Sequence, residues 1–256
     1  MSVAIPQRSQ FAFSFCALVF AVLLGVQALW LLVPELARPR IPYFPVDKAS
    51  AESVAGHRGL AGFAAEIGAV RGDLWADYAL ALSAGLLDES GDVAESTRNV
   101  AVTAAKLVPT DSRIWLLLAL IDQHRDQLGR GISGPLKMSY YTGPNAMGLI
   151  PTRLQLAVSS AAINDPELQD LVTREIRTIV TRRPDLRPAL FRAYRAASSE
   201  GRRFMEAKVG DLDRNLLASL RAGGSPADAN QNPPGTRQRG SGTPAENSPT
   251  SGANTR

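Results

Sequence analysis

Residues 11–33 read FAFSFCALVFAVLLGVQALWLLV, an apolar run of 23 residues without a single charge. An α-helix rises about 1.5 Å per residue, so this run is long enough to cross a hydrocarbon core of about 30 Å. Its backbone hydrogen bonds close within the segment, as a lipid environment requires. The run therefore predicts a membrane-spanning helix over 11–33, preceded by a short N-terminal tail over 1–10.

A cleaved secretory signal is the alternative interpretation of this run. Such signals have an apolar stretch of about 7 to 15 residues and end at a small-x-small cleavage site. Here the run is longer, and Pro34 and Glu35 follow it without an Ala-x-Ala motif. Trp30 lies near its end, where an aromatic ring favours the membrane interface. We therefore expect a retained single-pass anchor whose helix ends at Pro34 and Glu35.

The residues beside the anchor leave its orientation open. The N-terminal flank carries the α-amino group and Arg8. The C-terminal flank carries Arg38, Arg40 and Lys48, so the positive-inside rule applied literally favours a cytoplasmic domain. A short tail before a long apolar run is instead typical of a bacterial signal anchor. The lone Cys16 lies within the run, so the soluble part has no thiol, which suits an oxidising compartment.

Arginine outnumbers lysine 24 to 4, which is typical of a GC-rich bacterium. Together with the short tail, this bias favours a bacterial inner-membrane protein that crosses the membrane once. We expect its C-terminal domain to face the periplasm.

Composition divides the rest of the chain into three segments. Residues 34–50 contain prolines at 39, 42 and 45, a spacing that suits an extended linker. Residues 223–256 contain no Val, Ile, Leu, Met, Phe, Tyr or Trp. They cannot bury enough apolar surface to offset their ordering entropy, so this tail is predicted to be disordered. Residues 51–222 remain for one folded domain.

Helical periodicity runs through 51–222. Apolar residues recur at spacings of three and four in 114–121, 171–180 and 204–220. Asp165 followed by Pro166 is typical of a helix start. Alternation of β-branched residues, which would indicate strands, is absent. The predicted fold class is therefore all-α.

Parts of this pattern recur at intervals of 35 to 40 residues. The segment Trp75-Ala-Asp-Tyr-Ala-Leu aligns with Trp115-Leu-Leu-Leu-Ala-Leu. A proline precedes each of three predicted helix starts, and the residues six positions later are Trp115, Ile150 and Leu190. Over roughly 72–203 the chain resembles the tetratricopeptide repeats. The resemblance implies a stack of helical hairpins with a concave groove that binds proteins and has no chemistry of its own.

Two groups of residues form the candidate binding site. Tyr140, Tyr141 and Asn145 crowd a predicted helix end, and exposed tyrosine favours interfaces. The alternative is that one tyrosine belongs to the core and the other shields it. Arg192 and Arg195 are three apart on a helix and offer forked donors for carboxylate or phosphate. We predict that all five belong to one site for an acidic segment of a partner protein or for an anionic sugar.

Charge is unevenly distributed along the domain. Residues 51–170 hold 9 basic against 14 acidic side chains, whereas residues 171–222 hold 12 against 6. The basic half is either a patch for an anionic partner or is neutralised by the acidic half within the fold, and we favour the second interpretation. Nucleic acid is not expected as a partner of a periplasmic domain.

The sequence contains few of the residue patterns that are typical of catalytic sites. His57 and His124 are far apart in the chain, and the sequence has no HExxH, paired cysteines or GxSxG. No catalytic residue, metal site or cofactor is therefore predicted. One alternative function remains, because His124 next to Asp122 or Asp126 could act as a general base. The protein would then be an accessory subunit or a weak hydrolase with a site near His124.

The stretch SYYTGP, residues 139–144, resembles small helical membrane proteins that accompany bacterial extracellular polysaccharide synthesis. The expected function is a non-enzymatic, membrane-anchored helical-repeat adaptor or scaffold for a bacterial envelope assembly. The resemblance implies polysaccharide synthesis or export as its setting. The expected partners are the membrane and either an envelope protein or an anionic polysaccharide.

Overall fold

The computed structural model of the chain describes residues 7–38, 54–84, 91–125 and 131–223. Every regular element within these ranges is a helix, which confirms the predicted all-α fold class. The helices, with short 3-10 turns marked η, are α1 (Gln7–Ala37), α3 (Arg58–Ile67), α4 (Gly72–Ser83), α5 (Gly91–Leu107), α6 (Ser112–Arg125), α7 (Ser133–Thr142), η2 (Met147–Leu149), α8 (Ile150–Ser159), η3 (Ala161–Asn164), α9 (Pro166–Thr181), η4 (Pro184–Leu186), α10 (Arg187–Ala196), α11 (Ser199–Leu212) and α12 (Arg214–Arg221).

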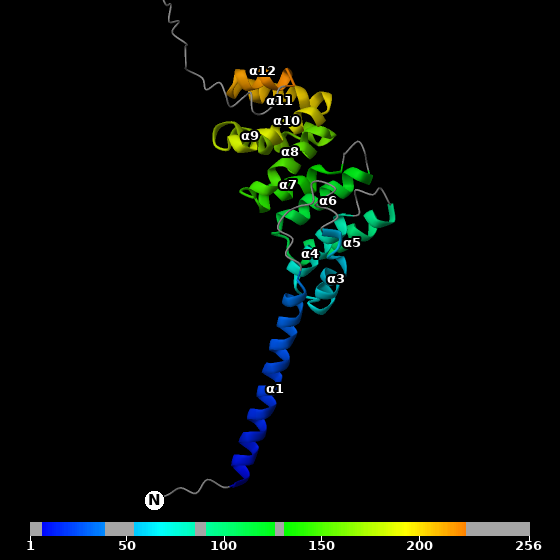
Figure 1. Cartoon of the computed structure of the whole chain (residues 1–256), viewed down its shortest axis with the longest axis vertical. Helices are drawn as coiled ribbons and strands as arrows, with labels where there is room; N and C mark the ends of the chain where they lie inside the picture. Colours follow the sequence, from blue (N-terminus) through cyan, green and yellow to red (C-terminus); the bar gives the residue numbers. More distant parts are fainter. Residues whose placement is uncertain (1–6, 39–53, 85–90, 126–130, 224–256) are drawn as a thin grey trace, which may run out of the picture.

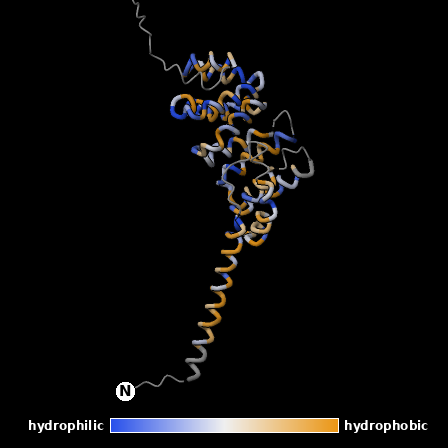
Figure 2. Tube along the Cα trace, viewed as in Figure 1, coloured by the Kyte–Doolittle hydropathy of each residue, from blue (hydrophilic) through white to orange (hydrophobic). Residues whose placement is uncertain are grey.

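Helix α1 projects from the other helices as a long stalk (Figure 1). Its segment Phe13–Ala37 is long and apolar enough to cross a membrane, and Figure 2 shows hydrophobic residues along it. Every residue from Phe13 to Leu32 is at least partly exposed, and α1 meets the described part of the domain only towards its C-terminal end, from Trp30 onward. A signal sequence meets the same criteria of length and composition, so α1 is a candidate membrane span.

The prediction that Pro34 and Glu35 end the first helix is wrong, because α1 continues to Ala37. Proline in a helix removes one backbone donor and costs about 3 kcal/mol. Contacts with the domain offset this loss: Pro34 is buried, and Trp30 Nε1 donates to the Ile67 carbonyl at the end of α3 over 3.1 Å. The rest of the predicted linker and the predicted disordered tail beyond Gly223 lie outside the described residues.

Ion pairs join Arg38, the residue after α1, to α4, and join α4 in turn to α6. Arg38 Nη1 lies 3.0 Å from Asp73 Oδ2, and Arg38 Nε lies 2.6 Å from Asp77 Oδ2. The other oxygen of Asp77 lies 3.5 Å from Arg113 at the start of α6. Burial raises the pKa of Asp77, and these two guanidinium groups oppose that shift. Side-chain bonds as well as chain connectivity therefore fix the stalk to the domain.

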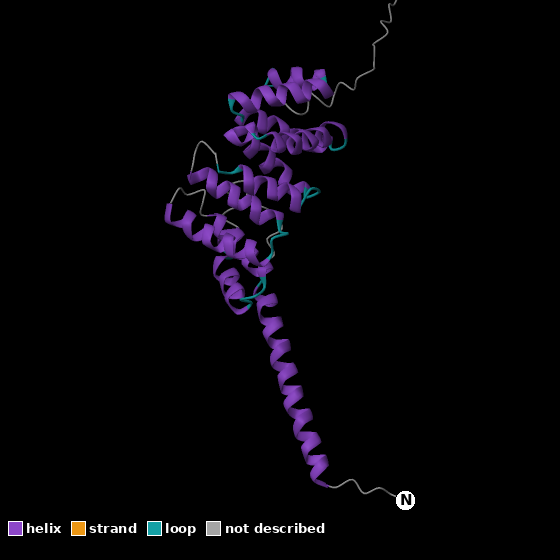
Figure 3. Ribbon diagram, turned by 180° about the vertical axis from the view of Figure 1, so that it is seen from behind, coloured by secondary structure: helices purple, strands orange, loops and turns teal. Residues whose placement is uncertain are grey.

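The domain is a stack of helices that extends away from α1 (Figures 1 and 3). Helices that follow one another pack together in its first part, α4 with α5 and α6 with α7. From α8 onward the pattern changes, because α8 packs chiefly against α10, and α11 contacts both α8 and α9. The stack thus begins as consecutive helical hairpins and ends as a bundle whose neighbours are separated in the sequence.

The starts of α4, α6, α8 and α10 follow at regular intervals. The fourth residues of these helices, which lie 40, 38 and 37 positions apart, are Trp75, Trp115, Arg153 and Leu190. The proline spacing in the sequence aligns Ile150 with Trp115. In the structure the residue of α8 equivalent to Trp115 is Arg153, three positions later. This arginine is central to the site described below.

Trp75 and Trp115 have the same local arrangement. Each indole Nε1 donates to the carbonyl oxygen six residues earlier, Ala69 at 3.0 Å and Pro109 at 2.7 Å. Both rings are half-buried and pack against the main core cluster. They therefore hold the turn before each helix against the core with one edge open to solvent.

Helices α8 and α11 meet closely at Gly201. The Ser198 amide donates to the Val158 carbonyl at the end of α8 over 3.0 Å, and Ser198 Oγ accepts from the Gly201 amide over 3.1 Å. A β-carbon at Gly201 would lie 1.9 Å from the Val158 oxygen. Glycine at this position is therefore a requirement of the packing between α8 and α11.

Candidate functional site

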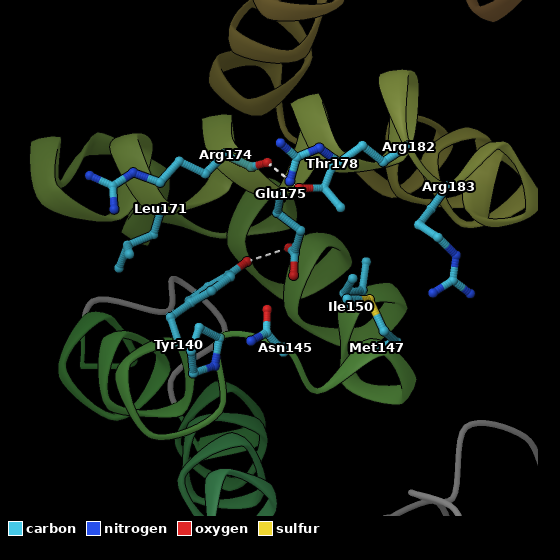
Figure 4. A pocket seen from close by; sticks show the side chains of 11 residues that line it. Tyr140, Asn145, Met147, Ile150, Leu171, Arg174, Glu175, Thr178, Arg182 and Arg183 are labelled. Atoms are coloured by element: carbon cyan, nitrogen blue, oxygen red, sulfur yellow. Dashed lines mark hydrogen bonds between the residues drawn. The ribbon is translucent and has the colours of Figure 1, made fainter.

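A pocket of about 300 Å³ lies between α7, α8 and α9 (Figure 4). Helix α7 and the turn after it, η2 with the start of α8, and α9 with its C-terminal turn supply the lining residues, which are Tyr140, Pro144, Asn145, Met147, Ile150, Leu171, Arg174, Glu175, Thr178, Arg182 and Arg183. Two of the five residues predicted from the sequence, Tyr140 and Asn145, belong to this lining.

A buried tyrosine and a buried carboxyl group form one wall of the pocket. Tyr140 Oη donates to Glu175 Oε2 over 2.6 Å, and the two side chains point toward each other in Figure 4. Burial raises the pKa of Glu175 to about 8, although the Tyr140 hydrogen bond and the charge of Arg153 act in the opposite direction. Burial and the neighbouring Glu175 also raise the pKa of Tyr140. Glu175 is therefore mostly protonated at neutral pH.

Arg153 holds this wall in place from behind. Its side chain is fully buried, Nε donates to Ser139 Oγ over 2.9 Å, and Nη1 donates to the Gly143 carbonyl over 2.8 Å. Nη2 donates to the Ser139 carbonyl. The guanidinium also lies 5.1 Å from the centre of the Tyr140 ring, a cation–π distance. Arg153 thus gives the Ser139 and Gly143 carbonyls a second donor, besides the backbone amides of Gly143 and Ala146, and fixes the position of Tyr140.

Arginines give the pocket a positive charge. Within the described residues Arg174 and Arg182 form no ion pair, whereas Arg183 pairs with Asp185 at 2.7 Å. In Figure 4 Arg174 and Arg183 extend on opposite sides of Glu175. Because Glu175 is mostly neutral, it does not offset this charge.

The ion pairs of the basic half stay within that half. Arg183 pairs with Asp185, Arg203 with Glu200, and Arg221 with Glu206. The interpretation that the basic half is neutralised by acids of the first half is therefore wrong for these arginines.

Tyr141 lies outside the pocket. It is exposed, and its Oη donates to Glu167 in the first turn of α9. Lys137 Nζ lies 2.8 Å from Glu167 and 2.9 Å from Asp165, so this group ties α7 to the start of α9. Successive helical residues project about 100° apart, which is why Tyr140 enters the core and Tyr141 does not. This placement matches the alternative interpretation of the sequence, in which one of the two tyrosines belongs to the core.

Arg192 and Arg195 are exposed on α10, and neither lines the pocket. The structure thus brings Tyr140 and Asn145 together with other arginines, those of α9 and the turn after it. A joint role for the five predicted residues stays a prediction.

Arg153 and Glu175 are not among the residues predicted from the sequence, although both leave a signal in it. Arg153 follows Trp115 at the interval of the helix starts. Glu175 lies between Val172 and Ile176 in an apolar stripe, where a charged residue indicates a buried group with a partner.

His124 is exposed on α6, away from the lining of this pocket. Of the two carboxylates considered with it, Asp122 pairs with Arg98 at 3.3 Å, and Asp126 lies outside the described residues. A catalytic role for His124 therefore gains no support from its described neighbours.

No protein-family model, no curated protein and no solved structure matches this chain. The resemblance to tetratricopeptide repeats stays a prediction, and the function has to be argued from the residues of the site.

The raised pKa of Glu175 predicts a pH-dependent stability. Between the unfolded pKa of 4.5 and the folded pKa of about 8, the folded state binds more protons than the unfolded state. Stability from this group is therefore fully present below the unfolded pKa and falls as pH rises through this window. We expect the wild type to lose about 2 kcal/mol relative to Glu175→Gln between about pH 6 and pH 8. Urea unfolding at several pH values measures the difference.

Glu167→Gln is the matched control for this experiment. It makes the same change on the same helix, but Glu167 is exposed and its pKa is lowered by Lys137 and Tyr141. Between about pH 6 and pH 8 its profile should run parallel to that of the wild type, because Glu167 is ionised in both the folded and the unfolded state over this range. Parallel profiles for wild type and Glu175→Gln would show that Glu175 is ionised throughout this range.

Proposed function

We propose that this chain is a non-enzymatic scaffold for a bacterial envelope assembly, retained in the inner membrane by α1, with its domain in the periplasm. The observation that carries the proposal is the attachment of α1 to the domain by side-chain bonds. A domain fixed to its anchor in this way holds the pocket between α7, α8 and α9 at a set position relative to the membrane.

The contacts at the end of α1 support retention of the anchor. Cleavage just after the apolar run would remove the Trp30 bond to Ile67. A cut beyond Ala37 would in addition remove Glu35, which lies 2.9 Å from Arg71, and Ala37, which packs against a small core cluster of the domain. A signal that is removed has no reason to form part of the mature fold.

The pocket supports an acidic segment of a partner protein as the bound group. Met147, Ile150 and Leu171 offer apolar surface, while Arg174 and Arg182 are free to bind carboxylates with their forked donors. The neutral Glu175 adds a hydrogen-bond donor and no repelling charge. A segment with one apolar side chain between acidic ones matches this arrangement.

The lining also supports binding over catalysis. It contains one carboxyl group and no histidine, cysteine or serine. Thr178 is the one aliphatic hydroxyl of the lining, and its Oγ1 donates to the Arg174 carbonyl and not to a base that could activate it. Tyr140 is already committed to Glu175, and its pKa is raised well above the ordinary value.

Site-specific photocrosslinking in cells tests the proposal. A photoreactive amino acid replaces Asn145 at the pocket or, as a control of the same residue type, Asn164 in η3, which does not line it. We expect a discrete envelope protein crosslinked at position 145 and not at position 164. A cytoplasmic partner would contradict the periplasmic placement. A diffuse product that is sensitive to periodate would identify an anionic sugar instead.

Charge reversal shows whether the crosslink depends on the pocket. Arg174→Glu with Arg182→Glu is expected to reduce it roughly tenfold or more, because each lost charge-assisted bond is worth about 1.5 to 3 kcal/mol. Arg192→Glu with Arg195→Glu makes the same change on α10 and should leave it intact. If the α10 variant lost the crosslink and the pocket variant kept it, the α10 arginines would be the binding residues, and the proposed role of the pocket would be contradicted.

A further inference from the structure

Helix α3 presents an apolar face to the outside of the domain. Leu60 is 55% exposed and Phe63 is 51% exposed, and residues three apart lie on one side of a helix. Val70, in the turn after α3, is 72% exposed. Large apolar side chains that gather on a surface mark a site of interaction with another apolar phase.

These side chains cannot turn inward. The adjoining side of α3 carries Ala61, Ala64 and Ala65, which are buried in two small clusters with residues of α4 and the segments beside it. Burying Leu60 or Phe63 would require α3 to roll and would expose these alanines. The apolar face therefore needs a partner outside the described part of the domain.

The position of α3 along α1 identifies that partner. Crossing a hydrocarbon core of about 30 Å takes about 20 helical residues, so a span that begins at Phe13 reaches the boundary near Leu32. Trp30 lies just inside this boundary, at the depth that tryptophan favours. Its indole donates to the Ile67 carbonyl, so the end of α3 lies at the same level.

The views of the molecule agree with this placement. Figure 1 shows α3 at the end of the domain that adjoins α1. Figure 2 shows hydrophobic residues of α1 followed directly by hydrophobic residues of α3. Helix α3 thus lies beside the domain end of the candidate span.

We propose that α3 lies in the membrane interface, with Leu60, Phe63 and Val70 inserted among the lipid head groups beside α1. The proposal rests on the anchorage by α1 proposed above. An amphipathic helix in this position buries its apolar face at the boundary between head groups and acyl chains. The domain then contacts the bilayer at two places, through the stalk and along α3, which fixes its tilt.

Depth-dependent fluorescence quenching in lipid vesicles tests this inference on the full chain. Cys16 is the only cysteine, so Cys16→Ser provides a background for single labels. An environment-sensitive fluorophore is attached after Phe63→Cys in α3, after Val22→Cys in α1, or after Leu212→Cys in α11. Leu212 is an exposed apolar residue at the far end of the stack and is the control.

Nitroxide lipids labelled at the head group or high on the acyl chain should quench position 63 several-fold more than position 212. Lipids labelled near the chain end should quench position 22 most. Quenching at position 22 without quenching at position 63 overturns the placement of α3 and leaves the anchor standing. Absence of quenching at position 22 overturns the anchor, and the placement of α3 with it.

Discussion

Gly201→Ala is expected to lower the free energy of unfolding by about 3 kcal/mol or more, one of the two largest effects foreseen for this protein. The new β-carbon would lie 1.9 Å from the Val158 oxygen and 2.7 Å from its carbonyl carbon. These are backbone atoms, so no side-chain rotation can relieve the clash. Helices α8 and α11 would have to separate, and the bond from Ser198 N to Val158 O would lengthen or break.

Thermal unfolding measures this effect. A loss of about 3 kcal/mol corresponds to a fall in Tm of roughly 6 to 12 °C for a domain of this size. Gly59→Ala is the matched control, since Gly59 also lies in the first turn of a helix and a β-carbon there would meet nothing within 4 Å. That substitution should be neutral or stabilise by about 0.5 to 1 kcal/mol. Equal Tm values for both variants would mean that α8 and α11 are not in close contact.

Arg153→Met is expected to destabilise the fold by about 3 kcal/mol and to disorder the pocket. Methionine fills much of the volume, but it donates no hydrogen bond. The carbonyl groups of Ser139 and Gly143 would each lose one of two donors, Ser139 Oγ would lose the donor Arg153 Nε, and Tyr140 would lose the guanidinium beside its ring. Removal of the buried charge itself offsets part of this loss, since isolated burial of a charge is unfavourable.

Two comparisons separate the role of Arg153 from that of an ordinary arginine. Arg177→Met changes an exposed arginine on α9 and should shift stability by less than about 0.5 kcal/mol. Arg153→Lys keeps the charge but cannot reach all three acceptors, so it should lie between wild type and Arg153→Met. If Arg153→Met unfolds at the same urea concentration as the wild type, the wall of the pocket does not depend on this residue.

The sequence predicts the helices better than their ends. Periodic burial reveals α6, α9 and α11, because one face of each helix must be apolar wherever it packs. The end of α1 is different. Local preference places a stop at Pro34, but bonds from Trp30 and Arg38 to distant residues extend the helix. Contacts of this kind join positions that no local pattern relates.

The same limit applies to the site. Helical spacing shows that Arg192 and Arg195 share a side of α10, but it cannot show that the cavity lies along α9. Tyr140 and Glu175 meet although they are 35 residues apart. Their pairing depends on how α7 and α9 pack, which the sequence pattern leaves undetermined. Asn145 was found because it adjoins the end of α7 in both the sequence and the fold.

The bonds between Arg38 and α4 also couple any rotation of α1 to the domain. A hinge at residue 38 would let α1 spin in the bilayer while the domain stayed still. With Arg38 held by Asp73 and Asp77, a rotation of α1 about its own axis would turn the helices that follow with it. If α1 spans a bilayer as proposed, such a rotation would move the pocket along an arc around the α1 axis.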